Sequence, residues 1–391
     1  MEIKNFIYNI DSISLYIHWP YCKKKCPYCD FNSYEAHTID NHKWIKGYIN
    51  ELQKHTSFIH NLTIKSIFFG GGTPSLMPLD AIHAIIDLVY SHNRKLNYTK
   101  DIEITLETNP SSFEIEKFKE LKAIGINRIS IGVQSFNDKK LKFLGRNHNS
   151  NEAIHAIRYA NDIFDNVSFD LIFALPNQTM EDIKQELEIA SQYFNKHISI
   201  YQLTIEPNTA FFHQNIQPAP EQESIEMYTY TKDYLNQKGL MQYEVSNFAK
   251  DGWQSYHNLN YWNGGLYLGI GPGAHGRLLK DNIALEQVQT KMPNNWLDKA
   301  ISSTSNSQIK PISTYDKLVE LILMSLRINK PIKPVILKHI SPVAVKYLLE
   351  NNFLSNIDNN IEVTQQGQLM LNYIIYQLIE NIINIPQHTL D

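Results

Sequence analysis

Between Ser14 and about Leu203 the chain repeats one pattern: a short apolar or β-branched run, a cluster of glycine, proline or polar residues, and a helical stretch. The runs that predict strands are Leu15–His18, Ser66–Phe69, Glu103–Leu106, Arg128–Val133, Ser168–Phe173 and Ile198–Leu203. Parallel neighbouring strands need crossover connections, so this alternation predicts a parallel sheet with helices packed outside it. A doubly wound sheet and a barrel-like sheet both satisfy the pattern.

Two of the connecting helices have recognisable boundaries. The apolar residues of Ile115–Ile124 recur on one helical face, and Gly125 predicts the end of that helix. Thr179 and Asp182 have the spacing of a capping box, which predicts a helix from there through about Phe194. Both helices would serve as crossover connections on the outside of the sheet.

Unusual residues follow directly after each predicted strand. They are the cysteines at 22–29, Gly70–Pro74, Glu107–Pro110, Gln134–Phe136, Leu175–Gln178 and Glu206–Thr209. Side chains at the carboxyl ends of successive parallel strands converge on one face, which is where (β/α) barrels carry out their chemistry. We therefore favour an α/β fold built on a partial barrel of about six strands.

All three cysteines of the chain lie within eight residues, with the spacing Cys22-x3-Cys26-x2-Cys29. Three thiolates can hold three corners of a four-iron, four-sulfur cluster and leave the fourth iron open to a ligand from outside the protein. A disulfide framework does not suit an odd number of cysteines that lie so close together. Zinc bound by the three cysteines and His18 is an alternative, although no second ligand pair follows them.

Composition places the chain among ordinary globular proteins, with 43% hydrophobic and 19% charged residues. Its net charge of −4 provides no basic field that would attract nucleic acid or anionic lipid. The N-terminal residues show no secretory signal, and no run of about 18 apolar residues exists to span a bilayer. We therefore expect a soluble cytoplasmic protein, in a compartment where thiols stay reduced.

Three segments are expected along the chain. Residues 1–205 would form the barrel, and the polar and aromatic residues of 206–300 would form an extension beside its mouth. The tract Ser302–Ser307 is typical of a linker. Residues 311–391 would form a smaller C-terminal α+β domain.

The C-terminal segment predicts a winged-helix-like arrangement. Its expected elements are helices over Tyr315–Arg327, Val343–Glu350 and Gly367–Ile383, and a hairpin over Phe353–Thr364 that turns at Asn359-Asn360. Residues 311–391 hold six Lys or Arg against seven Asp or Glu, whereas a wing that contacts DNA should be basic. We expect a structural cover or partner surface and no nucleic-acid partner.

With these motifs, the chain resembles the radical S-adenosylmethionine (SAM) superfamily, through the cysteine spacing after the first strand and Gly70–Pro74 after the second. Within it, the chain resembles the coproporphyrinogen dehydrogenase (HemN) branch, and most closely the haem-chaperone relatives of the HemW family. The stretches that carry the resemblance are Leu15–Pro20, Phe69–Leu76, Arg128–Phe136, Asp170–Pro176, Tyr201–Thr209 and His257–Trp262.

The resemblance implies cofactors and residue roles. SAM would chelate the open iron of a [4Fe-4S] cluster, and a reduced cluster would split it into methionine and a 5′-deoxyadenosyl radical. Tyr16 would lie near SAM and the cluster, and backbone groups of Gly71, Gly72 and Thr73 would approach the methionyl end. The nucleoside and carboxylate contacts would come from Glu107, Gln134, Arg146 and Asp170. Asp170 falls inside the fifth strand, so its side chain must point inward for this role.

Two features resemble the chaperone branch more than the oxidases. The oxidases carry a further cysteine two residues after the third ligand, where this chain has Phe31, and a longer segment before the cysteines. His257-Asn-Leu-Asn-Tyr-Trp262 matches a stretch associated with haem in HemW-like proteins, and neutral imidazole is a good iron ligand. The resemblance implies a chaperone that binds haem and passes it to an acceptor protein.

Alternatives to the chaperone stay open at this point. One is an oxygen-independent coproporphyrinogen III dehydrogenase, and another is a non-catalytic zinc or winged-helix binding protein. The resemblance also leaves open a homodimer and peripheral contact with membrane respiratory proteins.

The segment Gly271–Gly276 fits the dinucleotide pattern G-x-G-x-x-G. A dinucleotide fingerprint should open a helix, but the residues after Gly276 predict none. We interpret these glycines as a tight backbone bend near the site that positions His275.

Overall fold

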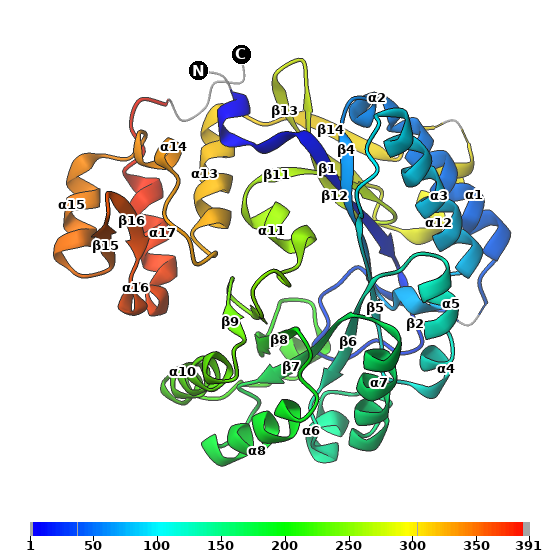
Figure 1. The fold of residues 1–391 in the computed structure, drawn as a ribbon, viewed down its shortest axis with the longest axis horizontal. Helices are drawn as coiled ribbons and strands as arrows, with labels where there is room; N and C mark the ends of the chain where they lie inside the picture. Colours follow the sequence, from blue (N-terminus) through cyan, green and yellow to red (C-terminus); the bar gives the residue numbers. More distant parts are fainter. Residues whose placement is uncertain (1–2, 37, 303, 386–391) are drawn as a thin grey trace.

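The computed structural model describes residues 3–36, 38–302 and 304–385. Its centre is a curved sheet in which six strands lie side by side in chain order (Figure 1). They are β1 (Tyr8–Trp19), β4 (Thr63–Gly71), β5 (Glu103–Thr108), β6 (Arg128–Gln134), β7 (Asn166–Phe173) and β8 (His197–Gln202). All neighbouring pairs among them are parallel. Each predicted strand coincides with one of these six.

The order of the strands explains why the sheet curls. Right-handed crossovers that always step in the same direction place every connecting helix on one face of a sheet. That outer face is covered by α1 (Asn41–Lys54), α3 (Leu79–Lys95), α7 (Ser150–Ile163) and α8 (Met180–Ser191) (Figure 1). The other face becomes the inside of a partial barrel, so the predicted fold class is confirmed and the doubly wound alternative is wrong.

The sheet extends beyond the six barrel strands at both edges. At one edge β11 (Gly265–Ile270) pairs in parallel with β1, which places Leu268 beside Leu15. Antiparallel strands β12 (His275–Lys280), β13 (Ile283–Gln289) and β14 (Ser307–Pro311) continue from it. At the other edge β10 (Asn247–Ala249) and β9 (Met241–Gln242) follow β8. The segment expected beside the barrel mouth therefore contributes strands to the main sheet.

The helix α11 (Tyr256–Trp262) lies inside the ring of strands (Figure 1). The carboxylate of Glu103, at the start of β5, accepts hydrogen bonds from the backbone N–H groups of Tyr256 and His257, both at 2.9 Å. Negative charge at a helix N-terminus is stabilising, and these N–H groups have no partner within the helix. Glu103 therefore fastens α11 at the amino ends of the barrel strands.

Two predicted helices of the barrel have different boundaries in the structure. The helix expected over Ile115–Ile124 is interrupted, and forms α4 (Ser112–Ile115) and α5 (Phe118–Ala123). The buried carboxylate of Glu114 accepts hydrogen bonds from the end of β5, including one of 2.8 Å from the Asn109 N–H, and this holds the first turn against the strand. The capping box of α8 is present as predicted, but α8 ends at Ser191 instead of Phe194.

A second hydrophobic core joins the C-terminal elements. It is built by α13 (Thr314–Ser325), α15 (Pro342–Glu350) and α17 (Leu371–Glu380), and it includes Phe6 from the N-terminal segment. The predicted last helix is divided into α16 (Gln365–Leu369) and α17. Among the described residues, no helix combines the length and apolar character needed to cross a membrane.

The predicted hairpin is formed by β15 (Leu354–Ile357) and β16 (Asn360–Val363). Its turn lies at Asp358-Asn359, one residue earlier than predicted. Both turn residues have positive φ, 50° for Asp358 and 64° for Asn359. Two-residue hairpin loops favour this conformation, and Asp and Asn tolerate it better than other side chains.

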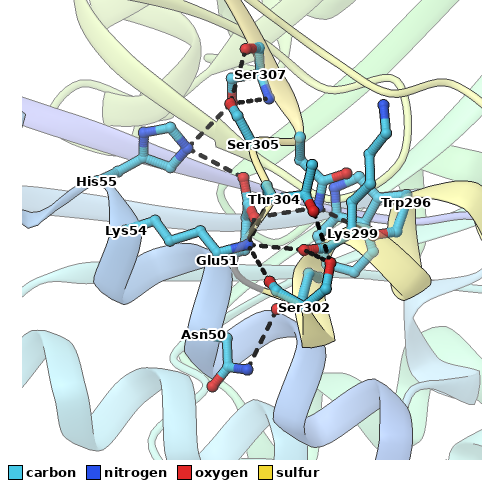
Figure 2. A network of polar contacts seen from close by, with 12 residues as sticks. Asn50, Glu51, Lys54, His55, Trp296, Lys299, Ser302, Thr304, Ser305 and Ser307 are labelled. Atoms are coloured by element: carbon cyan, nitrogen blue, oxygen red, sulfur yellow. Dashed lines mark hydrogen bonds and ion pairs between the residues drawn. The ribbon is translucent and has the colours of Figure 1, made fainter.

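A buried polar network under α1 ties the later strands to the barrel (Figure 2). The Glu51 carboxylate is almost fully enclosed, and accepts hydrogen bonds from Gln289 at 3.2 Å and Asn306 at 3.1 Å. His55 lies 3.2 Å from the same carboxylate. Burial raises the pKa of Glu51, but the hydrogen bonds from His55 and Asn306 outweigh it, so the pKa lies below its usual value.

The expected linker at Ser302–Ser307 is held by the same network, and its last residue begins β14 (Figure 2). The Lys54 ammonium donates to three backbone carbonyls, those of Lys299 at 2.9 Å, Ser302 at 3.2 Å and Thr304 at 2.9 Å. The described part of the tract is therefore fastened to α1.

Replacing Glu51 with Gln should lower the free energy of unfolding by about 2 kcal/mol at neutral pH, because the change removes charge-assisted hydrogen bonds from a buried network. Urea unfolding measures this loss. A carboxyl whose folded pKa is lowered stabilises the protein above its unfolded pKa, so the difference between wild type and variant should shrink as pH falls below about 4.5.

The matched control for this prediction is Glu350→Gln. Glu350 pairs with Lys346 on the surface, where the two side chains are 62% and 75% exposed. Such exposed pairs contribute roughly 0–1 kcal/mol. Equal losses for the two substitutions would contradict a stabilising role of the network.

Candidate functional site

A cavity with a volume of about 370 Å³ lies at the carboxyl ends of the barrel strands. The predicted site residues that line it are Cys22, Cys26, Cys29, Gly71, Gly72, Thr73, Glu107, Gln134, Arg146 and Asp170. Tyr16 and His257 are the predicted site residues that do not line it. The inward orientation required of Asp170 is present.

Cys22 is the last residue of β2 (Tyr21–Cys22), and Cys26 and Cys29 lie on the loop that leads from it to β3 (Tyr34–Glu35). Cys22 is buried, whereas Cys26 and Cys29 are partly exposed toward the cavity, and all three thiols are free. Among the described residues, no group of three His, Cys, Asp or Glu side chains is placed to hold a single metal ion. In a [4Fe-4S] cluster each thiolate binds a different iron, so this loop provides a suitable donor set for three corners.

The environment of the thiols disfavours three bare negative charges. Burial, with repulsion from Cys29 and Cys26, raises the pKa of Cys22 to about 11, and burial also raises the pKa of Cys29. The Arg146 guanidinium donates a hydrogen bond of 3.4 Å to the Cys26 sulfur. Thiolates here therefore need positive charge close by, which iron would supply.

The glycine-rich turn after β4 packs directly against the chain that leads to the cysteines. The N–H of Gly72 donates to the carbonyl of Trp19 at 2.7 Å, and that of Thr73 donates to Tyr21 at 2.8 Å. A Cβ on Gly72 would lie 2.6 Å from the Tyr21 oxygen, so only glycine fits. These two amides are already paired, which excludes them as donors to a ligand in this conformation.

The carboxyl groups of Glu107 and Asp170 line the cavity close enough to influence each other, and we call this part of the lining the floor. Burial and the nearby Asp170 raise the pKa of Glu107 to about 8, although the Gly71 N–H and Arg128 oppose the shift. Burial raises the pKa of Asp170 to about 6, and hydrogen bonds from Ser199 and Ser130 limit this rise. The floor is therefore a place where a cationic ligand would displace protons.

Arg146 and Gln134 form one wall. Arg146 donates to the Gly132 carbonyl at 2.7 Å and to the Asn109 side chain, so it connects the ends of two strands to Cys26. Gln134 has φ 73°, a left-handed conformation that is costly for a residue with a side chain. A Cβ on Gly132 would lie 3.0 Å from the Gln134 amide, so glycine makes room for this wall.

Tyr16 lies beneath the floor instead of lining it. Its hydroxyl is 3.0 Å from Nδ1 of His18, and Nε2 of His18 is 2.9 Å from the carbonyl oxygen of Asn32. Because that oxygen can only accept, Nε2 carries the proton and Nδ1 accepts from Tyr16. Both ring nitrogens of His18 are therefore engaged, so His18 could serve as the fourth ligand of the zinc alternative only by giving up one of these hydrogen bonds.

His257 lies away from the cavity, inside the barrel. Its ring is 2.8 Å from the Ser66 hydroxyl and 2.7 Å from the Tyr261 hydroxyl, and its exposed fraction is 1%. Burial, with a contribution from Arg128, lowers its pKa to about 3, so the ring is neutral. As a haem ligand His257 stays a prediction, and ligation would require one of its two ring nitrogens to give up its present partner.

Some residues of the cavity could not be found by motif reasoning. Ser130 donates to Asp170 at 3.2 Å, and Asn109 donates to the Thr73 hydroxyl at 3.1 Å. Tyr201 also lines the cavity. Ser130 and Tyr201 fall in stretches that carry the family resemblance, and Asn109 falls in the polar cluster after the third predicted strand, but nothing in the sequence singled these three residues out.

Comparison with known proteins extends these observations. The family model "Radical SAM superfamily" matches residues 16–190. A protein named heme chaperone HemW from Buchnera aphidicola (subspecies Acyrthosiphon pisum) is 37% identical over 94% of this chain and 94% of its own length. The HemW of Escherichia coli K12 is 34% identical over 93% of this chain and 97% of its own.

One solved structure is similar over almost the whole fold. It is the coproporphyrinogen III oxidase HemN of Escherichia coli, described as a radical SAM enzyme, with a TM-score of 0.78 and 20% identity. The match covers 96% of this chain and 92% of that one. At this identity the likeness concerns the fold.

Proposed function

This chain belongs to the radical SAM superfamily and, within it, to the HemW family, and from there we propose that it is a haem chaperone. In this proposal it holds a [4Fe-4S] cluster with SAM, binds haem, and transfers the haem to an acceptor protein. We place it in the cytoplasm, where the three thiols stay reduced.

The observation that carries the proposal is the extent of the similarity to proteins named heme chaperone. It spans 93–94% of this chain at 34–37% identity in relatives from Buchnera and Escherichia coli. The cavity supports the cluster and SAM part of the proposal, because three thiols from one segment line it together with carboxyl and guanidinium groups from other strands and their loops.

Cys22, Cys26 and Cys29 would hold the cluster, which when bound supplies one-electron chemistry and an open iron for SAM. Arg146 would orient the Cys26 sulfur through its hydrogen bond. Glu107 and Asp170 would bind the cationic parts of SAM and release protons as they do so. The aromatic and aliphatic side chains of Tyr28, Ile172 and Tyr201 would limit the access of water to the floor.

For haem we propose His257 as the iron ligand. The neutral ring suits iron, but both nitrogens are engaged inside the barrel. Ligation would thus require α11 to leave its place, which breaks the hydrogen bond to Ser66, whereas the bond to Tyr261 lies within α11 and can persist. Haem binding should therefore be slow compared with a preformed site, because a buried helix must first open.

Titration of the purified protein with haem tests the proposal. Wild type should develop a visible absorption band of ligated haem, and His257→Ala should bind at least about tenfold more weakly, because it lacks the axial ligand. The matched control is His197→Ala. His197 is equally buried and bonded to Ser168 and Tyr243, but lies outside α11.

The outcomes separate the alternatives. No band with wild type would refute the chaperone proposal, and equal loss in both variants would refute His257 as the ligand. In an anaerobic reaction with reductant, SAM and coproporphyrinogen III, release of 5′-deoxyadenosine from SAM together with carbon dioxide from the porphyrinogen would favour the dehydrogenase instead.

A further inference from the structure

The side chain of Asn32 connects the loop that carries the cysteines to a distant part of the chain. Its Nδ2 donates hydrogen bonds to the carbonyl oxygens of Pro272 and Lys291, both at 2.9 Å. Its Oδ1 accepts from the Tyr34 hydroxyl at 3.0 Å. Every polar atom of this amide is thus used, and the partners lie on both sides of the loop.

The backbone of Asn32 has a further contact. Its carbonyl oxygen accepts from Nε2 of His18 at 2.9 Å, and His18 in turn accepts from Tyr16, beneath the cavity floor. Asn32 therefore connects the cysteine loop to β1 through its carbonyl, and through its amide to the β11–β12 bend at Pro272 and to the segment after β13 at Lys291.

The β11–β12 bend contains glycines at the positions that lie against Asn32 and His18. Gly271 and Gly273 have φ of 116° and 75°, which other residues adopt only with strain. A Cβ on Gly273 would lie 2.7 Å from the Asn32 amide nitrogen, and one on Gly271 would lie 2.3 Å from the His18 oxygen. No helix follows the bend, since β12 begins at His275. The glycines of the dinucleotide-like pattern thus allow close contact with the loop.

Lys25 reinforces the same segment. Its ammonium donates to the carbonyl of Phe31 at 3.0 Å and to that of Ser33 at 3.2 Å, the residues on either side of Asn32. Lys25 therefore fastens the stretch after Cys29 to the first part of the loop. Asn32 fastens the same stretch to Pro272 and Lys291.

We propose that Asn32 is a positioning residue and that the bend Gly271–Gly276 is the dock that sets the cysteine loop against the cavity. The contacts of Asn32 are observed without a cluster. Only the effect of Asn32 on the cluster rests on the proposed function. The loop would keep Cys29 and its neighbours in one arrangement, and so fix how a cluster faces the floor carboxyls.

The acceptors at the dock distinguish the amide of asparagine from the carboxylate of aspartate, which has the same shape. Two carbonyl oxygens require two N–H donors, which Asn supplies and Asp lacks. An aspartate at this position would have the same shape but would place carboxylate oxygens against carbonyl oxygens. Asn32→Asp therefore separates hydrogen bonding from packing, and Asn32→Ala removes both.

The experiment compares these variants with Asn149→Asp. Asn149 caps α7 through its side-chain oxygen, which Asp provides equally well, so the same substitution should be neutral there. In cluster-free protein, hydrogen exchange of residues 22–34 should be about tenfold faster in Asn32→Asp than in wild type, while the melting temperature changes little. In reconstituted protein, loss of iron to a chelator should be about tenfold faster, with an altered electron paramagnetic resonance spectrum on addition of SAM.

Wild-type exchange and iron retention in Asn32→Asp would overturn the inference. If wild type assembles no cluster, the proposed function fails, and the exchange measurement alone then decides the role of Asn32. A change in Asn32→Ala without one in Asn32→Asp would assign the residue to packing, which also contradicts the proposal.

Discussion

Replacing Cys22, Cys26 or Cys29 singly with alanine will reduce the iron in anaerobically reconstituted protein from about four atoms per chain to less than about a tenth of that. The chain contains no other cysteine that could substitute as a ligand. Two thiolates hold only two corners of a cluster, which leaves it open to chelators. Iron and sulfide analysis, together with the visible and paramagnetic resonance spectra, measures the loss.

Ser33→Ala is the control for these variants. Ser33 lies on the same loop with its hydroxyl 3.8 Å from the Cys29 sulfur, but it offers no thiolate. It should keep the iron of wild type. Zinc without iron or sulfide in the wild-type protein would instead support a zinc site, and retention of the cluster in all three alanine variants would exclude the cysteines as its ligands.

SAM should bind more tightly as pH rises, with a dissociation constant that falls by up to about tenfold per unit between pH 6 and 8 and levels off above. Burial and the nearby Asp170 raise the pKa of Glu107 to about 8, so this carboxyl is mostly protonated at neutral pH. A ligand with a sulfonium group favours the ionised form, and the proton must leave on binding. The positive charge of Arg128 lowers the pKa of Glu107, but burial and Asp170 outweigh this effect.

Glu107→Gln should abolish most of this pH dependence and weaken SAM binding by about a hundredfold at pH 9, because a neutral amide replaces an ionised partner of the cation. Equilibrium dialysis with cluster-loaded protein measures both effects. Glu120→Gln, at an exposed position of α5, is the control and should behave as wild type. A pH dependence that persists in Glu107→Gln but is centred near pH 6 would transfer the role to Asp170, whose pKa is about 6.

Much of the barrel could be predicted because its signals are local. Strand runs such as Arg128–Val133 and the capping box at Thr179 depend on residues close together in the chain, and both are present in the structure. Glu107 and Gln134 could be assigned to one face from their position alone, since parallel strands bring their carboxyl ends together.

Elements that depend on distant partners could not be predicted in this way. The predicted helix over Ile115–Ile124 is interrupted because Glu114 bonds to the end of β5. β11 joins β1 across about 250 residues, and nothing in its own sequence indicates that partner. The tract after α12 (Pro293–Ile301) resembles a linker by composition, yet Lys54 holds its backbone.

The amino-acid order alone determined the alternation of strands and helices, the grouping of the thiols and the polar residues at the strand ends, because each of these depends on spacing along the chain. Tertiary structure alone decided that His257 is enclosed in the barrel while the thiols face a cavity. It also decided that Asn32 meets a bend 240 residues away. The reason is physical: burial and hydrogen-bond pairing are properties of the packed whole, and no local pattern of residues encodes which distant groups will satisfy them.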